Sequence, residues 1–202
     1  MREKKVKKII ITIWVIFILL VAGLCTFVVM NWDNISADLF GNKNKYTAVK
    51  SGDVHDLVNT YLKAMATADE KALKSLVTDP SQFDDMTMII SKSKVVTDYN
   101  NLVCYVVDGP VDNTYIVYPV YNSTINGVES TPLDIMSPLY IITDSNAKLL
   151  IDNRTKDKSV EDYINTVTES DSIQEVYRMV KEDEEKCMEE DPSFKEFYEK
   201  LN

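Results

Sequence analysis

The chain has 202 residues, 45% of them hydrophobic and 27% charged, and a formal net charge of −10. Its Lys and Arg residues form no cluster in the sequence beyond residue 8, which argues against binding to the phosphates of a nucleic acid, so we expect no nucleic-acid partner. A single histidine, His55, and three cysteines without Cys-x-x-Cys spacing exclude the usual zinc sites, so we expect no metal and no cofactor.

The N-terminal segment predicts a membrane anchor. Residues 1–8 form a basic stub with a net charge of +4, and residues 9–30 form an apolar run of 22 residues without a charge. At about 1.5 Å per residue this run spans roughly 33 Å as a helix, which matches a bilayer core. It is longer than the apolar region of a cleaved signal peptide. We therefore expect an uncleaved transmembrane helix that contacts the lipid bilayer through Ile9, Trp14, Leu20 and Met30, among others.

Charge predicts the orientation of this helix. Positive residues stay on the cytoplasmic side of a membrane. Residues 31–202 carry a net charge of −14, because the stub contributes +4 and the apolar run contributes nothing. We expect a single-pass protein of the cell membrane with a cytoplasmic N-terminus and an extracellular C-terminal domain. Residues 31–50 are polar, lack a sustained period and are expected to form a stalk.

Residues 51–93 have helical periodicity. Asp53 is expected to cap a first helix, whose buried stripe contains Val54, Leu57, Val58, Tyr61, Leu62 and Met65. Asp69 is expected to cap a second helix, which Asp79-Pro80 ends. A weaker helical segment covers residues 83–92.

Strand periodicity follows. Residues 102–107, 114–121, 139–143 and 148–151 predict four strands, separated by turn residues such as Asn126-Gly127 and Asp144-Ser145-Asn146. Pro119 indicates an edge strand or a bulge, because proline cannot donate a ladder hydrogen bond. Helices followed by an antiparallel meander predict an α+β fold.

Residues 154–202 predict a helical tail. Ser159 is expected to cap one helix, Ser172 and Glu175 to form a capping box for a second, and Asp191-Pro192 to begin a third. The apolar stripes of these helices pack either on the domain's own sheet, which we favour, or on a partner. The acidic runs at 182–185 and 189–191 lack the glycine turn of a calcium loop and are interpreted as solvated faces.

The stretch VHDLVNTYLKAMATADEKALKSLV resembles the opening of NTF2-like (cystatin-like α+β) domains, including their Asp-x-x-Ala-Leu second helix at Asp69, Ala72 and Leu73. The resemblance covers residues 51–153. It implies a curved sheet around a long helix with a cone-shaped pocket, which we expect Tyr61, Met65, Tyr118 and Tyr140 to line. The layout of the whole chain is similar to that of membrane-anchored surface proteins of Gram-positive anaerobes.

Three classes of function remain open. The first, which we favour, is a membrane-anchored extracytoplasmic binding or interaction module without catalytic activity. The second is a structural subunit of an envelope-spanning secretion or conjugation complex, which the single span followed by an NTF2-like domain resembles. The third is a small-molecule enzyme of the NTF2-like class, with a tyrosine (Tyr61, Tyr105, Tyr118 or Tyr140) beside an acid, although no catalytic motif of that family is matched.

Two further questions stay open at this stage. NTF2-like domains often dimerise through the outer sheet face, so the resemblance implies either a homodimer or an envelope protein as partner. Both sides of the strand at 114–121 are apolar, with Ile116, Tyr118 and Val120 opposite Tyr115, Val117 and Tyr121. Cys104 and Cys187 could pair outside the cell, but the sequence does not show their geometry.

Overall fold

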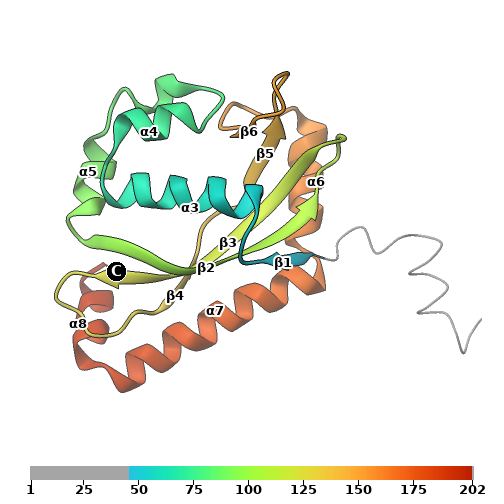
Figure 1. The fold of residues 1–202 in the computed structure, drawn as a ribbon. Helices are drawn as coiled ribbons and strands as arrows, with labels where there is room; N and C mark the ends of the chain where they lie inside the picture. The colour runs from blue at the N-terminus through green and yellow to red at the C-terminus, as the bar shows by residue number, and fades with distance from the viewer. Residues whose placement is uncertain (1–45, 202) are drawn as a thin grey trace, which may run out of the picture. The chain divides into compact units, whose positions relative to one another are not determined.

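A computed structural model describes residues 46–201 of the chain. They belong to one structural unit, Asn44–Asn202. The basic stub, the expected transmembrane helix with Ile9, Trp14, Leu20 and Met30, and residues 31–45 of the stalk lie outside the described residues. Among residues 46–201, no helix combines the length and the apolar character that crossing a membrane requires. The fold is α+β: one short strand comes first, then a group of helices, then the other strands of the curved antiparallel sheet, and then helices again (Figure 1).

The sheet is built around one long central strand, β3 (Thr114–Ile125). Its β-branched and aromatic residues favour an extended chain that is buried on both faces. The strand order is β1-β2-β3-β5-β6, and β4 pairs with the last part of β3. The other strands are β1 (Thr47–Val49), β2 (Val96–Asp108), β4 (Leu133–Ile135), β5 (Leu139–Thr143) and β6 (Leu149–Ile151).

Two of these strands were not predicted from the sequence. β1 and β4 have three residues each, which is too short for an alternating pattern to be recognised. β1 lies within the range assigned to the stalk, yet Thr47 pairs with Val106 and Val49 with Cys104. The assignment of Thr47–Val49 to the stalk was therefore wrong, because these residues complete the edge of the sheet.

Pro119 lies in the central strand, so the edge or bulge that it indicated is absent there. β3 pairs with β5 up to Val117 and with β4 from Val120 onward. The Pro119 carbonyl accepts a hydrogen bond from Met136 N at 3.2 Å. This bond lies on the side of β3 where its pairing partner changes from β5 to β4. In an antiparallel strand the N and C=O of one residue point to the same side. The proline nitrogen therefore faces the gap between β4 and β5, where no ladder bond is required.

Three α-helices and a short 3-10 helix lie on one side of the sheet, with α3 next to the sheet and α4 beyond α3 (Figure 1). They are α3 (Asp53–Ala66), α4 (Glu70–Ser75), η1 (Pro80–Phe83) and α5 (Thr87–Ser93). Leu57, Val58 and Leu62 of α3 are buried in one cluster with Val117 and Tyr121 of β3. The apolar stripe that the sequence predicted is thus the face that α3 buries.

The ends of these helices differ partly from the prediction. The residue before α3 is Gly52 with φ 98°, a left-handed conformation that favours glycine, so Asp53 is inside the first turn rather than at the cap. Asp69 does cap α4, since its side chain accepts from Ala72 N at 3.0 Å. The helix expected at 83–92 is confirmed in part, as the shorter α5, which begins at Thr87.

The tail helices cover the opposite face of the sheet. They are α6 (Lys158–Thr168), α7 (Asp171–Glu190) and α8 (Pro192–Leu201). Val167 of α6 and Ile173 of α7 are fully buried with Ile116 and Tyr118 of β3. Each such aliphatic burial stabilises the fold by about 1.5–3 kcal/mol. The tail therefore packs on the domain's own sheet, and the face expected to support a homodimer is covered by the same chain.

The residues that precede α6 and α7 lie two positions earlier than the predicted caps. Asp157 precedes α6 and Ser170 precedes α7, in place of Ser159 and Ser172. Ser170 Oγ donates to the carbonyl of Val167 at 2.6 Å, which closes the turn between the two helices. Because of this tight turn, α7 begins directly after Ser170. Ser172 therefore lies inside the helix rather than at the predicted cap.

A polar network joins the end of β6 to the segment after α4. Thr78 Oγ1 donates to Asp152 Oδ1 at 2.6 Å, and Arg154 Nε donates to the same oxygen at 2.7 Å. Asn153 accepts from Asp79 N and donates to the Asp79 carbonyl, both at 2.8 Å. These bonds satisfy a buried carboxylate and hold one end of the α4–η1 layer against the sheet.

Candidate functional site

The four residues expected to line one pocket lie on two different faces of the sheet. Tyr61 and Met65 pack in the cluster beneath α3, whereas Tyr118 and Tyr140 pack in the cluster beneath α6. The Tyr118 side chain is fully buried, and its hydroxyl is 2.8 Å from Thr168 Oγ1. Burial raises the pKa of Tyr118 to about 12. None of the three cavities described here is lined by any of these four residues.

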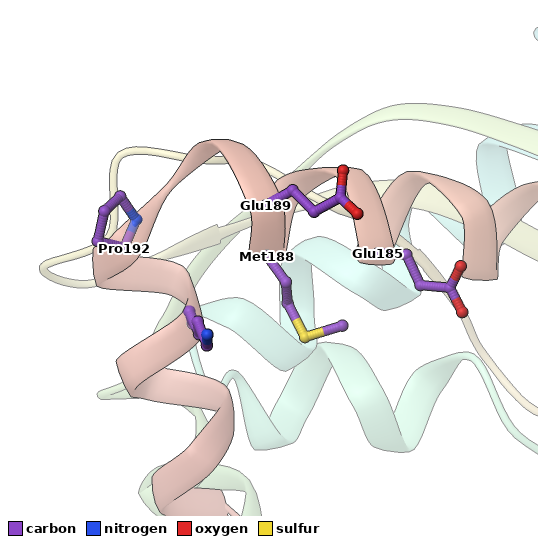
Figure 2. A pocket seen from close by; sticks show the side chains of 5 residues that line it. Glu185, Met188, Glu189 and Pro192 are labelled. Carbon is purple, nitrogen blue, oxygen red and sulfur yellow. The ribbon is translucent and has the colours of Figure 1, made fainter.

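The largest of these three cavities, of about 620 Å³, lies in the bend between α7 and α8 (Figure 2). Glu185, Met188, Glu189, Pro192 and Lys195 line it. Figure 2 shows the carboxyl groups of Glu185 and Glu189 apart from each other along α7, so these polar groups do not converge. A recess made by one pair of consecutive helices, without convergent polar groups, does not have the features of a ligand site.

A smaller cavity, of about 250 Å³, is built by six separate segments. We call it the terminal cleft, because it lies where β3 ends and α8 begins. Its apolar lining comes from β2, β3, β4 together with Pro132 just before it, and α8. Its polar lining comes from α5, β3, β4 and α7. The lining residues are Lys92, Val96, Ser123, Ile125, Pro132, Leu133, Asp134, Glu184, Phe194, Phe197 and Tyr198.

Asp191 places the aromatic wall of the terminal cleft. Its Oδ1 accepts from Ser193 N at 2.8 Å and from Phe194 N at 3.3 Å, which caps α8 as predicted. Its Oδ2 accepts from Ser130 N at 2.8 Å. One carboxylate thus joins α8 to the β3–β4 connection. Phe194 is buried, and its ring centroid is 6.3 Å from that of Tyr198.

A second carboxylate fixes the opposite wall. Asp183 Oδ2 accepts from Leu133 N at 2.8 Å, which satisfies a donor on the edge strand β4. Asp183 and Asp191 belong to the acidic runs that the sequence analysis interpreted as solvated faces. That interpretation was wrong for these two residues, because each carboxylate has a backbone N–H partner in another element.

Asp134 and Glu184 place two carboxyl groups in the lining of the terminal cleft. Asp134 Oδ1 accepts from Ile135 N at 2.8 Å, and its Oδ2 accepts from Ser123 Oγ at 3.3 Å. Partial burial raises the pKa of Glu184, and the negative charge of Asp134 raises it further. The cleft thus concentrates negative charge between apolar walls, and Lys92 is the cation in its lining.

Behind Asp134 lies a pair of buried tyrosines. The rings of Tyr99 and Tyr121 meet edge to face, with centroids 5.0 Å apart. Burial raises the pKa of both hydroxyls, and the charge of Asp134 adds to the effect. Both hydroxyls therefore stay protonated at neutral pH. An acid beside tyrosines is present, but these tyrosines are buried and do not line the cleft.

The remaining titratable groups do not assemble a metal or nucleophilic site within residues 46–201. No group of three or more His, Cys, Asp or Glu side chains there is arranged to hold a metal ion. Cys104 and Cys187 are both free thiols, so the disulfide left open by the sequence is not formed. Burial raises the pKa of the Cys104 thiol to about 12. A thiol with this pKa is not a nucleophile at neutral pH.

Sequence periodicity could not have found the terminal cleft. Asp134 lies in the unpredicted strand β4, and Glu184 lies in an acidic run that carries no apolar stripe. The Phe194, Phe197 and Tyr198 face of α8 was predicted, but its packing partner was not. No family model, curated protein or solved structure matches this chain.

Proposed function

We propose that this protein is a membrane-anchored, extracytoplasmic binding module without catalytic activity. Residues 9–30 anchor it in the cell membrane, its N-terminus is cytoplasmic, and an NTF2-like domain is presented outside. The helix-helix-strand order and a curved sheet over α3 support the NTF2-like assignment. The terminal cleft is the observation that carries the binding function, because six segments converge on it.

The chemistry of the terminal cleft favours a small ligand with an apolar body and a cationic group. Phe194, Phe197 and Val96 offer apolar contact, while Asp134 and Glu184 offer carboxylates. Two like charges in a partly buried site repel each other. A bound ammonium group relieves this repulsion and forms charge-assisted hydrogen bonds, which a neutral ligand cannot do.

The test is a titration of the full-length protein in phosphatidylcholine nanodiscs with 2-phenylethylamine, followed by calorimetry. We expect saturable binding of the amine and much weaker binding of the neutral analogue 2-phenylethanol. Asp134→Asn and Phe197→Ala should each weaken binding of the amine. The matched control is Glu189→Gln, an exposed acid outside the cleft, which should leave binding unchanged. Equal binding of the alcohol and the amine would count against a cation site.

The membrane topology has its own test. Ser145 lies in the exposed turn between β5 and β6. Both variants are made in a Cys187→Ser background, because the native Cys187 is partly exposed. In this background, a Ser145→Cys variant should react with a membrane-impermeant maleimide on intact cells. A Glu3→Cys variant, in the basic stub, should react only after lysis. The reverse pattern would contradict an N-terminus inside the cell.

Exposed apolar side chains near α5 favour a second candidate, a subunit of an envelope-spanning complex. Met88 and Ile90 are 80% and 45% exposed, and Val95 just after α5 is 38% exposed. Large apolar groups that remain exposed commonly mark contact with another protein. A photocrosslinking amino acid at position 88 tests this in the native membrane. Reproducible crosslinks to other envelope proteins would favour the complex, and crosslinks to a second copy would favour a homodimer.

A further inference from the structure

A second cavity, of about 420 Å³, lies between α3 and β2 and shares no lining residue with the terminal cleft. His55, Asn59 and Lys63 of α3 follow one another at intervals of four residues, so they lie on one face of the helix. Lys50, directly after β1, and residues Tyr99–Val103 of β2 complete the lining. We call it the amide cavity. Its volume falls within the range of small-molecule sites, about 300–1,000 Å³.

A β-bulge shapes the strand side of the amide cavity. Asn100 pairs with Asn122 and Val103 pairs with Val120, so β2 has one residue more than β3 between these pairs. Asn101 sits in this bulge with φ 54°, a left-handed conformation that is uncommon for a residue with a side chain. Bulges of this kind re-aim side chains and are frequent beside binding sites.

The bulge gives the cavity oriented amide groups. Asn100 Nδ2 donates to Thr124 Oγ1 at 3.2 Å, and Asn101 Nδ2 donates to Asn122 Oδ1 at 3.0 Å. Asn59, which faces them from α3, makes no side-chain hydrogen bond to any described residue. A carboxamide both donates and accepts, which suits the hydroxyl groups of a ligand.

The lining of the amide cavity is positively charged, whereas the chain as a whole has a net negative charge. Lys50 and Lys63 are in its lining, and no acidic residue is. Both arginines of residues 46–201 are paired with carboxylates, whereas Lys50 and Lys63 form no ion pair with any described residue. Asp56, the acid beside His55 on α3, has its Oδ1 3.2 Å from His55 Nδ1 but does not line the cavity.

We infer that the amide cavity binds a small anionic sugar derivative. The lysines and His55 would hold the anionic group, a carboxylate or a phosphate, through charge-assisted hydrogen bonds. Asn59, Asn100 and Asn101 would bind the hydroxyl groups. The buried Tyr99 and Leu102, together with Val103, form the apolar part of the lining, against which the carbon skeleton packs. This site does not depend on the terminal cleft.

The test uses the chain's single histidine as a reporter. Full-length protein with ¹³C-labelled histidine, in phosphatidylcholine nanodiscs, gives one histidine ring signal set from His55. Glucose 6-phosphate, glucuronate and neutral glucose are titrated at constant pH and ionic strength. We expect saturable shifts of the His55 ring signals with one or both anions and none with glucose. The anion with the higher affinity distinguishes a phosphate from a carboxylate ligand.

Matched variants separate a site from general attraction between charges. Lys50→Gln and Lys63→Gln should each weaken binding at least about fivefold, as expected for loss of one charge-assisted hydrogen bond. Both lysines are exposed, so the variants should keep the wild-type melting temperature. Lys71→Gln, an exposed lysine of α4 outside the cavity, should leave binding unchanged. Absence of saturation, equal shifts with glucose, or equal losses in the Lys71 variant would overturn the inference.

Discussion

Asp191 Oδ2 accepts a hydrogen bond of 2.8 Å from the backbone N–H of Ser130, which lies 61 residues earlier in the chain. The other oxygen of the same carboxylate caps α8 through Ser193 N. One side chain therefore positions the last helix and the β3–β4 connection together. The terminal cleft lies between these two segments, so its shape depends on this contact.

Replacing Asp191 with Ala should detach α8 from the domain. The hydrogen bonds from Ser193 first, and those from Ser130 after them, hold the pKa of the Asp191 carboxyl well below its usual range. These hydrogen bonds therefore stabilise the fold at pH values above the usual pKa of aspartate, and their contribution is lost as the pH falls below that value. We expect faster amide exchange in residues 192–201 and a lower melting temperature at pH 7. The difference from wild type should shrink in acid, and Glu189→Ala should show neither effect.

Asp152 is the centre of the network between β6 and the α4–η1 layer. Burial alone would raise the pKa of this carboxyl, but bonds from Arg154 and Thr78 and the charge of Lys156 outweigh it and lower the pKa. Asp152→Ala leaves Arg154 Nε without its acceptor, and Thr78 Oγ1 keeps only its longer contact of 3.2 Å with Asn153 Oδ1. We expect a loss of about 2–3 kcal/mol in the free energy of unfolding at pH 7, measured with urea.

The same variant should lose its effect in acid. A carboxyl whose pKa is lower in the folded state stabilises the fold above its unfolded pKa, and this contribution disappears as the pH falls. Asp112→Ala, at an exposed turn where the side chain has no described partner, serves as the control. An Asp152→Ala protein as stable as this control at pH 7 would show that the network contributes nothing.

Leu62 tests the core beneath α3. Its side chain is 1% exposed and belongs to the cluster shared by α3 and β3. Leu62→Ala should cost about 2–5 kcal/mol in the free energy of unfolding, because it leaves a cavity in a packed core. Leu62→Asp should prevent folding, since an unpaired buried charge costs more still. Thr60→Ala, on the exposed side of the same helix, should change stability little, and a similar loss in both alanine variants would refute this packing.

The sequence predicted those elements whose residues have a clear period or a clear boundary. β5 has the predicted bounds, and α8 begins at Pro192 after its Asp191 cap. α3 was predictable from its apolar stripe, because a helix that buries one face against a single layer has apolar residues at helical spacing on that face. Cap positions were less predictable, since Asp157, Ser159, Ser170 and Ser172 are all suitable caps and tertiary packing selects among them.

The sites were not predictable in the same way. Tyr61 and Tyr118 were expected in one pocket, because a period of two or of 3.6 shows that a residue is buried but not which layer buries it. Asp134 and Glu184 come together only when α7 crosses the far end of the sheet. The bulge at Asn101 depends on the register between β2 and β3, which no local pattern encodes.

Thiol reactivity should separate the two cysteines of the described domain. Cys104 is fully buried, and burial raises its pKa to about 12, whereas Cys187 on α7 is partly exposed. We expect an impermeant maleimide to label Cys187 slowly in the native protein and Cys104 only after denaturation. Mass spectrometry of peptides with and without urea measures this. Rapid native labelling of Cys104 in a Cys187→Ser protein would contradict the burial of β2.

The two carboxyl groups of the terminal cleft should titrate as interacting neighbours. Burial is the main cause of the raised pKa of Glu184, and the charge of Asp134 is the next. Asp134→Asn removes that charge with little change in shape, so the pKa of Glu184 should fall but stay above the ordinary value for glutamate. Carboxyl ¹³C NMR of Glu184 follows this directly, with Asp112→Asn as a distant control. An unchanged Glu184 pKa in the Asp134 variant would mean that the two charges are screened from each other, which would weaken the argument that the cleft selects a cation.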